Sequence, residues 1–208
     1  MGTLLNRRRY MGGKALPYDA EVEYIEGTGT QYINTGIKPS STLRSVLKFS
    51  IKNGFGFANS AFLFGAFDQQ ESYYSVALRS PTSIRVPNGT SFSNCTIPTI
   101  DFDTSHEISY KAGEVKYDGQ VISSYSGRFI SNPTVNIRLF GRDSFDLKNQ
   151  YITPYLCIEG YEVYDGNELV LDLIPVRVGQ VGYMRDKISG KLYGNSGTGS
   201  FTLGPDKT

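Results

Sequence analysis

The spacing of apolar residues is the feature that most constrains what this chain can fold into. No window of eleven or more residues places apolar side chains at positions i, i+3, i+4 and i+7, the pattern of an amphipathic helix. Short runs rich in Val, Ile, Tyr and Phe occur instead, and Gly, Asn, Asp, Ser and Pro separate them. A parallel α/β fold needs long crossovers, usually helices, between its strands, so the sequence excludes that class.

The apolar and alternating runs predict short strands along the whole chain. Asp118-Gly119 and Asp165-Gly166 each lie between two such runs and predict tight hairpins, and residues 186–190 predict a third reversal. The predicted strands cover residues 21–26, 32–34, 44–51, 61–67, 73–79, 83–86, 107–111, 114–117, 120–125, 134–140, 152–164, 168–173, 182–185 and 191–193. Many short strands at this spacing predict an all-β fold, an antiparallel two-sheet β-sandwich.

Composition excludes much ordinary enzyme chemistry. The 208 residues fit one domain with a small appendage, and the 20% of charged residues are typical of a globular protein. Two cysteines, Cys95 and Cys157, cannot form a disulfide framework or a four-thiolate zinc site. One histidine, His106, leaves little room for histidine-ligated metals. The net charge of +1 gives no overall field for nucleic acid.

The charge is distributed unevenly along the chain. Residues 1–18 carry four bases and no acid, so residues 19–208 carry 17 bases and 20 acids. The segment lacks the apolar core of a secretory signal peptide, and no apolar run reaches the length of a membrane span. We expect an extended N-terminal arm over 1–18 that docks on an acidic partner, followed by one domain over 19–208. The bases of this docking arm are Arg7, Arg8, Arg9 and Lys14.

Two blocks of sequence carry a resemblance to a known family. Residues 23–36 read EYIEGTGTQYINTG, and residues 172–201 contain DLIPVR, VGYM and DKISGKLYGNSGTGSF. Together they resemble the concanavalin A-like (laminin-G-type) jelly-roll domains found in virion structural proteins of phages of gut bacteria and in surface proteins of those bacteria. The resemblance implies a two-sheet sandwich in which the first and last blocks lie near one another. The arm is similar to short leaders on such phage proteins.

Paired carboxylates raise the alternative of a glycanase. Concanavalin A-like glycanases carry their acids on one face of a strand, and retaining hydrolysis needs two carboxyl groups about 5–5.5 Å apart. Glu21 and Glu23 share one face of a predicted strand. The alternation with Val22 and Tyr24 is equally typical of a half-exposed strand, and the block lies at the start of the domain rather than in mid-sheet. We therefore expect no enzymatic activity.

Other catalytic and metal-binding patterns are weak. Asp101 and Asp103 are the best candidates for calcium ligands, but no glycine marks a ligand loop, so a polar loop before residue 108 is favoured. We expect no cofactor. There is no Gly-x-Ser-x-Gly motif for a serine nucleophile, and Cys157 in an apolar run predicts a buried thiol. Residues 88–90 and 94–96 match the glycosylation pattern, and we interpret them as chance matches in a polar loop.

Aromatic and polar side chains give the candidates for sugar binding. Sugars present apolar faces that stack on aromatic rings and polar edges that form hydrogen bonds, and the absence of Trp removes the best stacking ring. The candidate glycan-binding residues are Tyr73, Tyr74, Arg79, Tyr125, Arg128, Arg142 and Asp143. A second aromatic group exceeds what one strand face can bury and suggests a subunit interface; it comprises Phe55, Phe57, Phe62, Phe64 and Phe67.

These features together predict a phage virion structural protein. It would be a capsid decoration, a head fibre or a tail-associated protein, made in the cytoplasm of the bacterial host and located in the virion. Its partners would be other capsid or tail proteins and further copies of itself, with host-surface or mucus glycans as the attachment target. No nucleic acid binding and no membrane insertion are expected. The alternative is a carbohydrate-binding module or adhesin of a gut bacterium, and a glycanase ranks below both.

Overall fold

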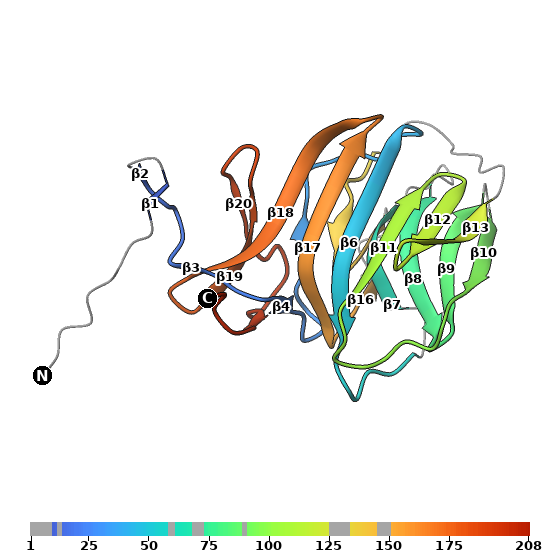
Figure 1. Cartoon of the computed structure of the whole chain (residues 1–208), viewed down its shortest axis with the longest axis horizontal. Coiled ribbons are helices and arrows are strands. Elements are labelled where there is room, and N and C mark those ends of the chain that lie inside the picture. The colour runs from blue at the N-terminus through green and yellow to red at the C-terminus, as the bar shows by residue number, and fades with distance from the viewer. Residues whose placement is uncertain are drawn as a thin grey trace, which may run out of the picture.

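The fold is a sandwich of two β-sheets, seen in a computed structural model (Figure 1). The structure describes residues 10–11, 14–57, 61–67, 73–88, 91–124, 134–144 and 151–208. Within these residues there is no helix, and accordingly none long and apolar enough to cross a membrane. The all-β, two-sheet prediction is confirmed.

The larger sheet has 11 strands and lies in front in Figure 1. Its central path runs β13-β12-β11-β6-β17-β18-β19-β20, with β4 joining β17 to β21 and β3 pairing with β18. All of its described pairings are antiparallel. Its strands are β3 (Ala20–Glu21), β4 (Ile25–Glu26), β6 (Leu43–Ile51), β11 (His106–Lys111), β12 (Glu114–Tyr117), β13 (Gln120–Ser124), β17 (Leu156–Asp165), β18 (Glu168–Val178), β19 (Val181–Asp186), β20 (Leu192–Tyr193) and β21 (Thr202–Leu203).

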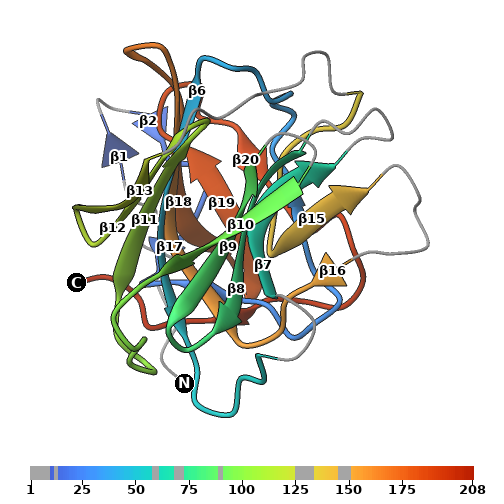
Figure 2. The ribbon, with the colours of Figure 1, turned by 90° about the vertical axis from the view of Figure 1, so that its right-hand side faces the viewer.

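The smaller sheet has eight strands, with the path β10-β9-β8-β7-β14-β5. β15 also belongs to this sheet and pairs with β7 in parallel, whereas the sequence predicts antiparallel pairing. Figure 2 shows this sheet beside the larger one, with β11 to β13 on the left and β7 to β10 on their right. Its strands are β5 (Ile33–Asn34), β7 (Ala61–Phe67), β8 (Tyr73–Ser80), β9 (Ser83–Asn88), β10 (Ser91–Thr96), β14 (Arg138–Leu139), β15 (Gly141–Ser144) and β16 (Tyr151–Ile152).

The core fills the space between the two sheets. Alternate residues of β6, namely Leu47, Phe49 and Ile51, turn inward and are fully buried. Inward side chains of β7 and β8, such as Phe64 and Val76, meet them from the smaller sheet. The opposite face of β6 is left for polar residues, and this alternation positions the site described below.

The first and last sequence blocks lie side by side, as the resemblance implied. The Ser196 and Thr198 amides donate to the carbonyls of Tyr32 and Thr30. The contact needs a residue without a side chain, because a Cβ on Gly197 would lie 2.1 Å from the carbonyl oxygen of Thr30. The Gly-rich stretch before Phe201 is therefore an ordered loop.

The N-terminal segment is described in part. β1 (Tyr10–Met11) and β2 (Lys14–Ala15) pair only with each other and lie apart from both sheets (Figure 1). Tyr18, the last residue of the predicted arm, already packs on the sandwich and is 3% exposed.

Four predicted elements differ from the structure. The predicted strand 152–164 is divided between the two sheets, with β16 in the smaller and β17 in the larger. The predicted strand 21–26 is split into β3 and β4, and only two residues of 134–140 form a strand, β14. The segment predicted to be a polar loop with chance glycosylation matches contains β10, which pairs with β9 through the whole of 91–96. Its Ser and Asn residues give no apolar signal, and its strand state comes from the ladder with β9.

The phenylalanine group does not form an exposed interface. Phe55, Phe62 and Phe64 are buried in the core, at 6%, 5% and 0% exposure. Phe57 packs edge-on against Phe55, and Phe67 contacts the Arg142 guanidinium. Both sheets bury apolar rings here, which explains the crowding without a partner subunit.

Candidate functional site

The outer face of the 11-stranded sheet carries a continuous polar trough. Alternate residues of β6, together with the residue just after it, turn toward this face: Arg44, Val46, Lys48, Ser50 and Lys52. Three hollows of about 470, 210 and 540 Å³ follow one another along them. The upper and middle hollows share Val46, and the middle and lower hollows share Lys48. We call this surface the trough.

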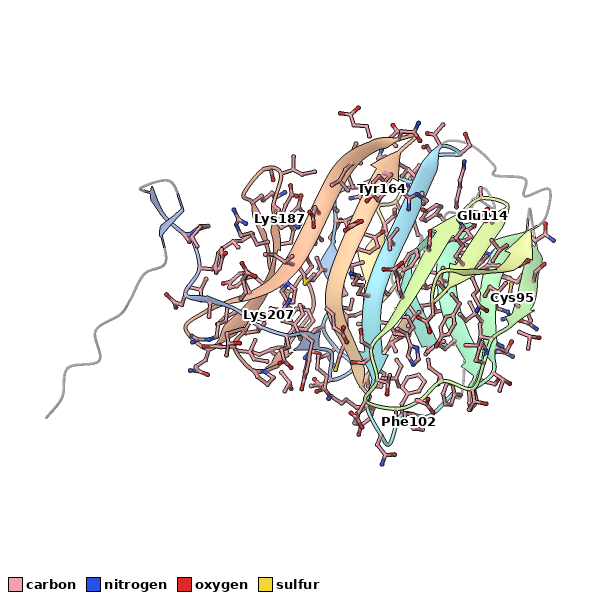
Figure 3. The ribbon with its side chains drawn as sticks, viewed as in Figure 1. Cys95, Phe102, Glu114, Tyr164, Lys187 and Lys207 are labelled. Carbon is pink, nitrogen blue, oxygen red and sulfur yellow. The ribbon has the colours of Figure 1, made fainter. Side chains whose placement is uncertain are left out.

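Figure 3 locates four residues that line the trough. Glu114 of β12 and Tyr164 of β17 mark its upper part, whereas Lys187 and Lys207 mark its side near β18 and the C-terminus. These side chains come from strands and turns far apart in the sequence. The sheet therefore assembles the trough, and no single motif encodes it.

A β-bulge in β17 brings two glutamates to the same face. The register between β17 and β6 shifts between Ile158 and Gly160, which inserts one extra residue. Ile158 and Tyr161 consequently both point into the core, while Glu159 and Glu162 both line the middle hollow. Strict alternation would have placed the two glutamates on opposite faces.

Two carboxylates face each other across the middle of the trough. Glu162 and Asp172 are direct partners in the antiparallel ladder of β17 and β18, which places their Cβ atoms about 4.5–5.5 Å apart. Each carboxylate has a partner of its own: the Tyr164 hydroxyl donates to Glu162 Oε2 at 2.7 Å, and Lys187 Nζ lies 2.7 Å from Asp172 Oδ2. The bond to Glu162 raises the pKa of Tyr164, and Asp172 raises the pKa of Lys187.

Each end of the trough holds a tyrosine beneath a cation. At the upper end the Arg44 guanidinium lies 3.9 Å from the centre of the Tyr164 ring. At the lower end Lys52 Nζ lies 4.6 Å from the centre of the Tyr24 ring and 3.2 Å from Asp103 Oδ1. The hydrogen bonds to Asp103 and Tyr24 raise the pKa of Lys52 despite partial burial. A tyrosine ring, a cation and a carboxylate thus lie together at both ends.

The charges that line the trough balance. Its basic residues are Arg44, Lys48, Lys52, Lys111, Lys116, Lys187 and Lys207, and its acidic residues are Glu23, Asp103, Glu107, Glu114, Glu159, Glu162 and Asp172. Several form local ion pairs, such as Lys48 with Glu107 at 4.0 Å and Lys116 with Glu114 at 3.4 Å. The trough therefore offers many hydrogen-bond donors and acceptors with no net charge at pH 7.

The structure does not assemble the predicted glycan-binding residues into one site. Tyr74 is a correction: its ring is fully buried, and its hydroxyl donates to Ser45 Oγ, so no ligand can stack on it. Arg79 is exposed near the far end of β8 from Tyr73. The Arg142 guanidinium lies 4.6 Å from the centres of the Phe62 and Phe67 rings.

The remaining predicted positions are placed only partly. Tyr73 and Asp143 belong to strands that flank β7, in positions paired with Phe67 and Ala66. Tyr125 and Arg128 lie outside the described residues, as do Arg7, Arg8 and Arg9 of the docking arm, whereas the backbone of Lys14 lies in β2.

The glutamates predicted as a catalytic pair and the aspartates predicted as calcium ligands make different contacts. Glu21 accepts a hydrogen bond from the Tyr18 hydroxyl, and only Glu23 lines the trough. Asp101 is exposed, and Asp103 pairs with Lys52. In the part of the chain that the structure describes, no three His, Cys, Asp or Glu side chains are grouped to hold a metal ion.

The histidine and the cysteines contribute to packing and to contacts between strands. His106 Nδ1 lies 2.9 Å from Asp118 Oδ2, and its ring stacks on Tyr117, which ties β11 to the β12–β13 hairpin. Both cysteines are buried and unpaired with each other. Burial raises the pKa of Cys157 to about 12, so it is a thiol at neutral pH, as predicted.

Comparison with known proteins identifies the fold but no family. No protein-family model and no curated protein matches this sequence. Among solved structures, a Bacteroides ovatus protein described as a "putative carbohydrate binding protein" matches with a TM-score of 0.62 and 9% identity, covering 90% of this chain and 61% of that one. The LG4-5 domains of the mouse laminin α1 chain match with a TM-score of 0.50 and 16% identity, covering 84% of this chain and 49% of theirs.

These matches define the class of fold. The chain is a β-sandwich of the concanavalin A-like, laminin G type, and it spans about three fifths of the first structure and half of the second. At such low identity the likeness shows the architecture alone. The predicted membership of a phage virion family has no support from these two structures.

Proposed function

We propose that this protein is a carbohydrate-binding, lectin-like domain that holds a glycan in the trough. The observation that carries the proposal is the trough itself, a long hollow of fixed donors and acceptors on the outer face of a rigid sheet. Sugar hydroxyl groups both donate and accept hydrogen bonds, so they match alternating ammonium and carboxylate groups. The Bacteroides ovatus structure, described as that of a "putative carbohydrate binding protein", supports the same class of ligand.

Each end of the trough pairs a tyrosine ring with a cation, which offers charged donors to sugar hydroxyl groups. The Tyr164 and Tyr24 rings line the upper and lower hollows, and their cations hold them in place. Strands carry most of the other lining groups, so the backbone that positions them is ordered before a ligand binds. A shallow, preorganised surface of this kind favours binding over chemical conversion.

Glycan-array binding of the whole chain tests the proposal, with Lys48→Ala as the diagnostic variant. The Lys48 side chain is 60% exposed and lines two of the three hollows, so its loss leaves the fold intact. We expect about a tenfold loss of affinity, because a hydrogen bond from a charged group disappears. Lys38→Ala is the matched control, since Lys38 is exposed and lines none of the three hollows. Equal binding by both variants would contradict the site.

A second candidate function is display of this domain on a phage virion. The observation in its favour is the basic N-terminal segment of 1–18, which precedes an acidic domain. Its partners would be capsid or tail proteins and other copies of the chain, with the trough facing host-surface or mucus glycans. A truncation lacking residues 1–17 should fold but fail to incorporate into particles. Mass spectrometry of purified virions measures this, and normal incorporation of the truncated chain would contradict docking by the arm.

A further inference from the structure

We infer that the trough takes a linear, uncharged glycan chain that lies parallel to β6 and fills all three hollows at once; this inference rests on the proposed function. It names the chemical class of the ligand and its direction across the sheet. Two features of the molecule support it, the length of the trough and its charge balance, and a glycine in the smallest hollow makes it testable.

The length of the trough requires a ligand of several sugar units. Its floor follows β6 from Arg44 to Lys52, eight residue steps, which span about 26 Å at the strand rise. The hollows adjoin one another at Val46 and Lys48, so they form one row along the strand. A ligand with one anchored sugar would use only one hollow, whereas an extended chain uses the floor from end to end.

The charge balance of the trough selects against charged polymers. Seven bases and seven acids line it, and each of the three hollows is lined by three bases and three acids, so neither sign dominates any part of it. A polyanion would gain from the lysines but would meet three carboxylates in each hollow, with Glu159 and Glu162 among them. A polycation meets the converse repulsion. A neutral chain of hydroxyl groups uses both kinds of group without that penalty.

Gly160 lines the middle hollow of the trough and makes the inference testable. It lies on the middle hollow, which is the smallest of the three at about 210 Å³. A Cβ at this position would contact only the carbonyl oxygen of Leu173, at an ordinary distance of 3.7 Å, and the residue has no positive φ. A large side chain there can therefore fill the hollow while the backbone stays in place.

The experiment measures retardation of the whole chain in gels that contain polysaccharides. The neutral panel is xylan, mannan, β-1,3-glucan and amylose, and the anionic panel is heparin and polygalacturonate, at about 0.15 M salt. We expect retardation by at least one neutral polymer, loss of at least tenfold in affinity for Gly160→Phe, and no change for Gly56→Phe. Gly56 is the matched control because it is exposed, its added Cβ meets open space, and it lines no part of the trough.

Oligosaccharides from the retarding polymer give the second readout. We expect affinity to rise with chain length until the ligand covers all three hollows, and Gly160→Phe to abolish this rise while short oligomers still bind. If Gly160→Phe unfolds, as judged by circular dichroism, Glu162→Gln at the same hollow replaces it, with the same expected loss of the length dependence.

Each result separates this inference from the proposed function. Retardation only by the anionic panel overturns the inference and leaves carbohydrate binding standing. Retardation by a neutral polymer that Gly160→Phe or Glu162→Gln does not weaken also overturns it, because the ligand then occupies one end alone. No retardation by either panel overturns the proposed function and the inference with it.

Discussion

At the scale of single residues, the core is organised by one serine between two buried tyrosines. Ser45 of β6 exchanges a hydrogen bond with the Tyr161 hydroxyl at 2.8 Å and accepts one from the Tyr74 hydroxyl at 3.0 Å. Both rings are fully buried, and burial raises the pKa of each hydroxyl. Because β6 and β17 belong to one sheet and β8 to the other, this contact fixes how the two sheets face each other.

Ser45→Ala should destabilise the protein by about 2 kcal/mol, because the buried Tyr161 hydroxyl loses its partner and the Tyr74 hydroxyl keeps only its longer bond to the Tyr110 carbonyl. Urea denaturation followed by circular dichroism measures the change. The matched control is Ser109→Ala on β11, which is half-buried on the trough side of the same sheet and should change stability by less than about 0.5 kcal/mol. A Ser45→Ala protein as stable as the control would show that the hydroxyl network contributes nothing.

At the scale of elements, the turn after β19 is held by one carboxylate. Asp186 Oδ1 accepts from the amides of Asp172 and Ile188, and Oδ2 accepts from the amide and hydroxyl of Ser189. These bonds lower the pKa of Asp186 despite its burial. Since the folded-state pKa lies below the ordinary 3.8, the stabilisation is present above that value and is lost as pH falls through the lowered pKa.

Asp186→Asn should therefore weaken the dependence of the free energy of unfolding on pH in the acid range. The amide keeps one acceptor oxygen but turns a donor toward Ser189, so we expect a loss of about 1–3 kcal/mol near neutral pH. From about pH 4 to about pH 2 the free energy of unfolding should fall less steeply than in the wild type. Urea titrations at several pH values measure both effects, with the exposed Asp101→Asn as control. Identical acid slopes for wild type and variant would contradict the role of Asp186.

At the scale of the whole molecule, the C-terminal segment closes the larger sheet. β21 pairs with β4, Asp206 bridges to Val22, and the Arg177 guanidinium donates to both Asp206 oxygens at 2.7 and 2.6 Å. Close packing accompanies the pairing, since a Cβ on Gly182 would lie 2.9 Å from Leu203. The segment thus covers an edge of the sheet that would otherwise expose Ile25.

Removing residues 202–208 should lower the melting temperature by roughly 10 °C, which corresponds to the loss of about 3 kcal/mol in a domain of this size. Removing residues 1–15 should change it by less than about 2 °C, because β1 and β2 pair with neither sheet. Differential scanning calorimetry of the two truncated chains compares them directly. Equal melting temperatures would mean that the C-terminal strand is not part of the cooperative unit.

The sequence alone determined the architecture. Alternating apolar residues predict strands because one face of each strand must be buried. The Asp118-Gly119 turn connects β12 and β13 as predicted, and the second predicted hairpin turns at Gly166 and Asn167, one residue later than Asp165-Gly166. The closing loop could also be predicted, since the two end blocks resemble those of laminin G-type domains. These signals are local in the chain, so they can be recognised without knowing which strands pair.

Only the tertiary structure decided where the site lies. Tyr74 is a sound candidate by residue type, yet the sheet turns it into the core. Glu162 and Asp172 form no motif, because a bulge at Gly160 and a ladder between two strands bring them together. The alternation within a strand predicts which of its residues share a face. The register between strands and the position of bulges determine which side chains of neighbouring strands lie next to each other. Those follow from packing between distant segments, and for that reason the trough could be found only in the folded molecule.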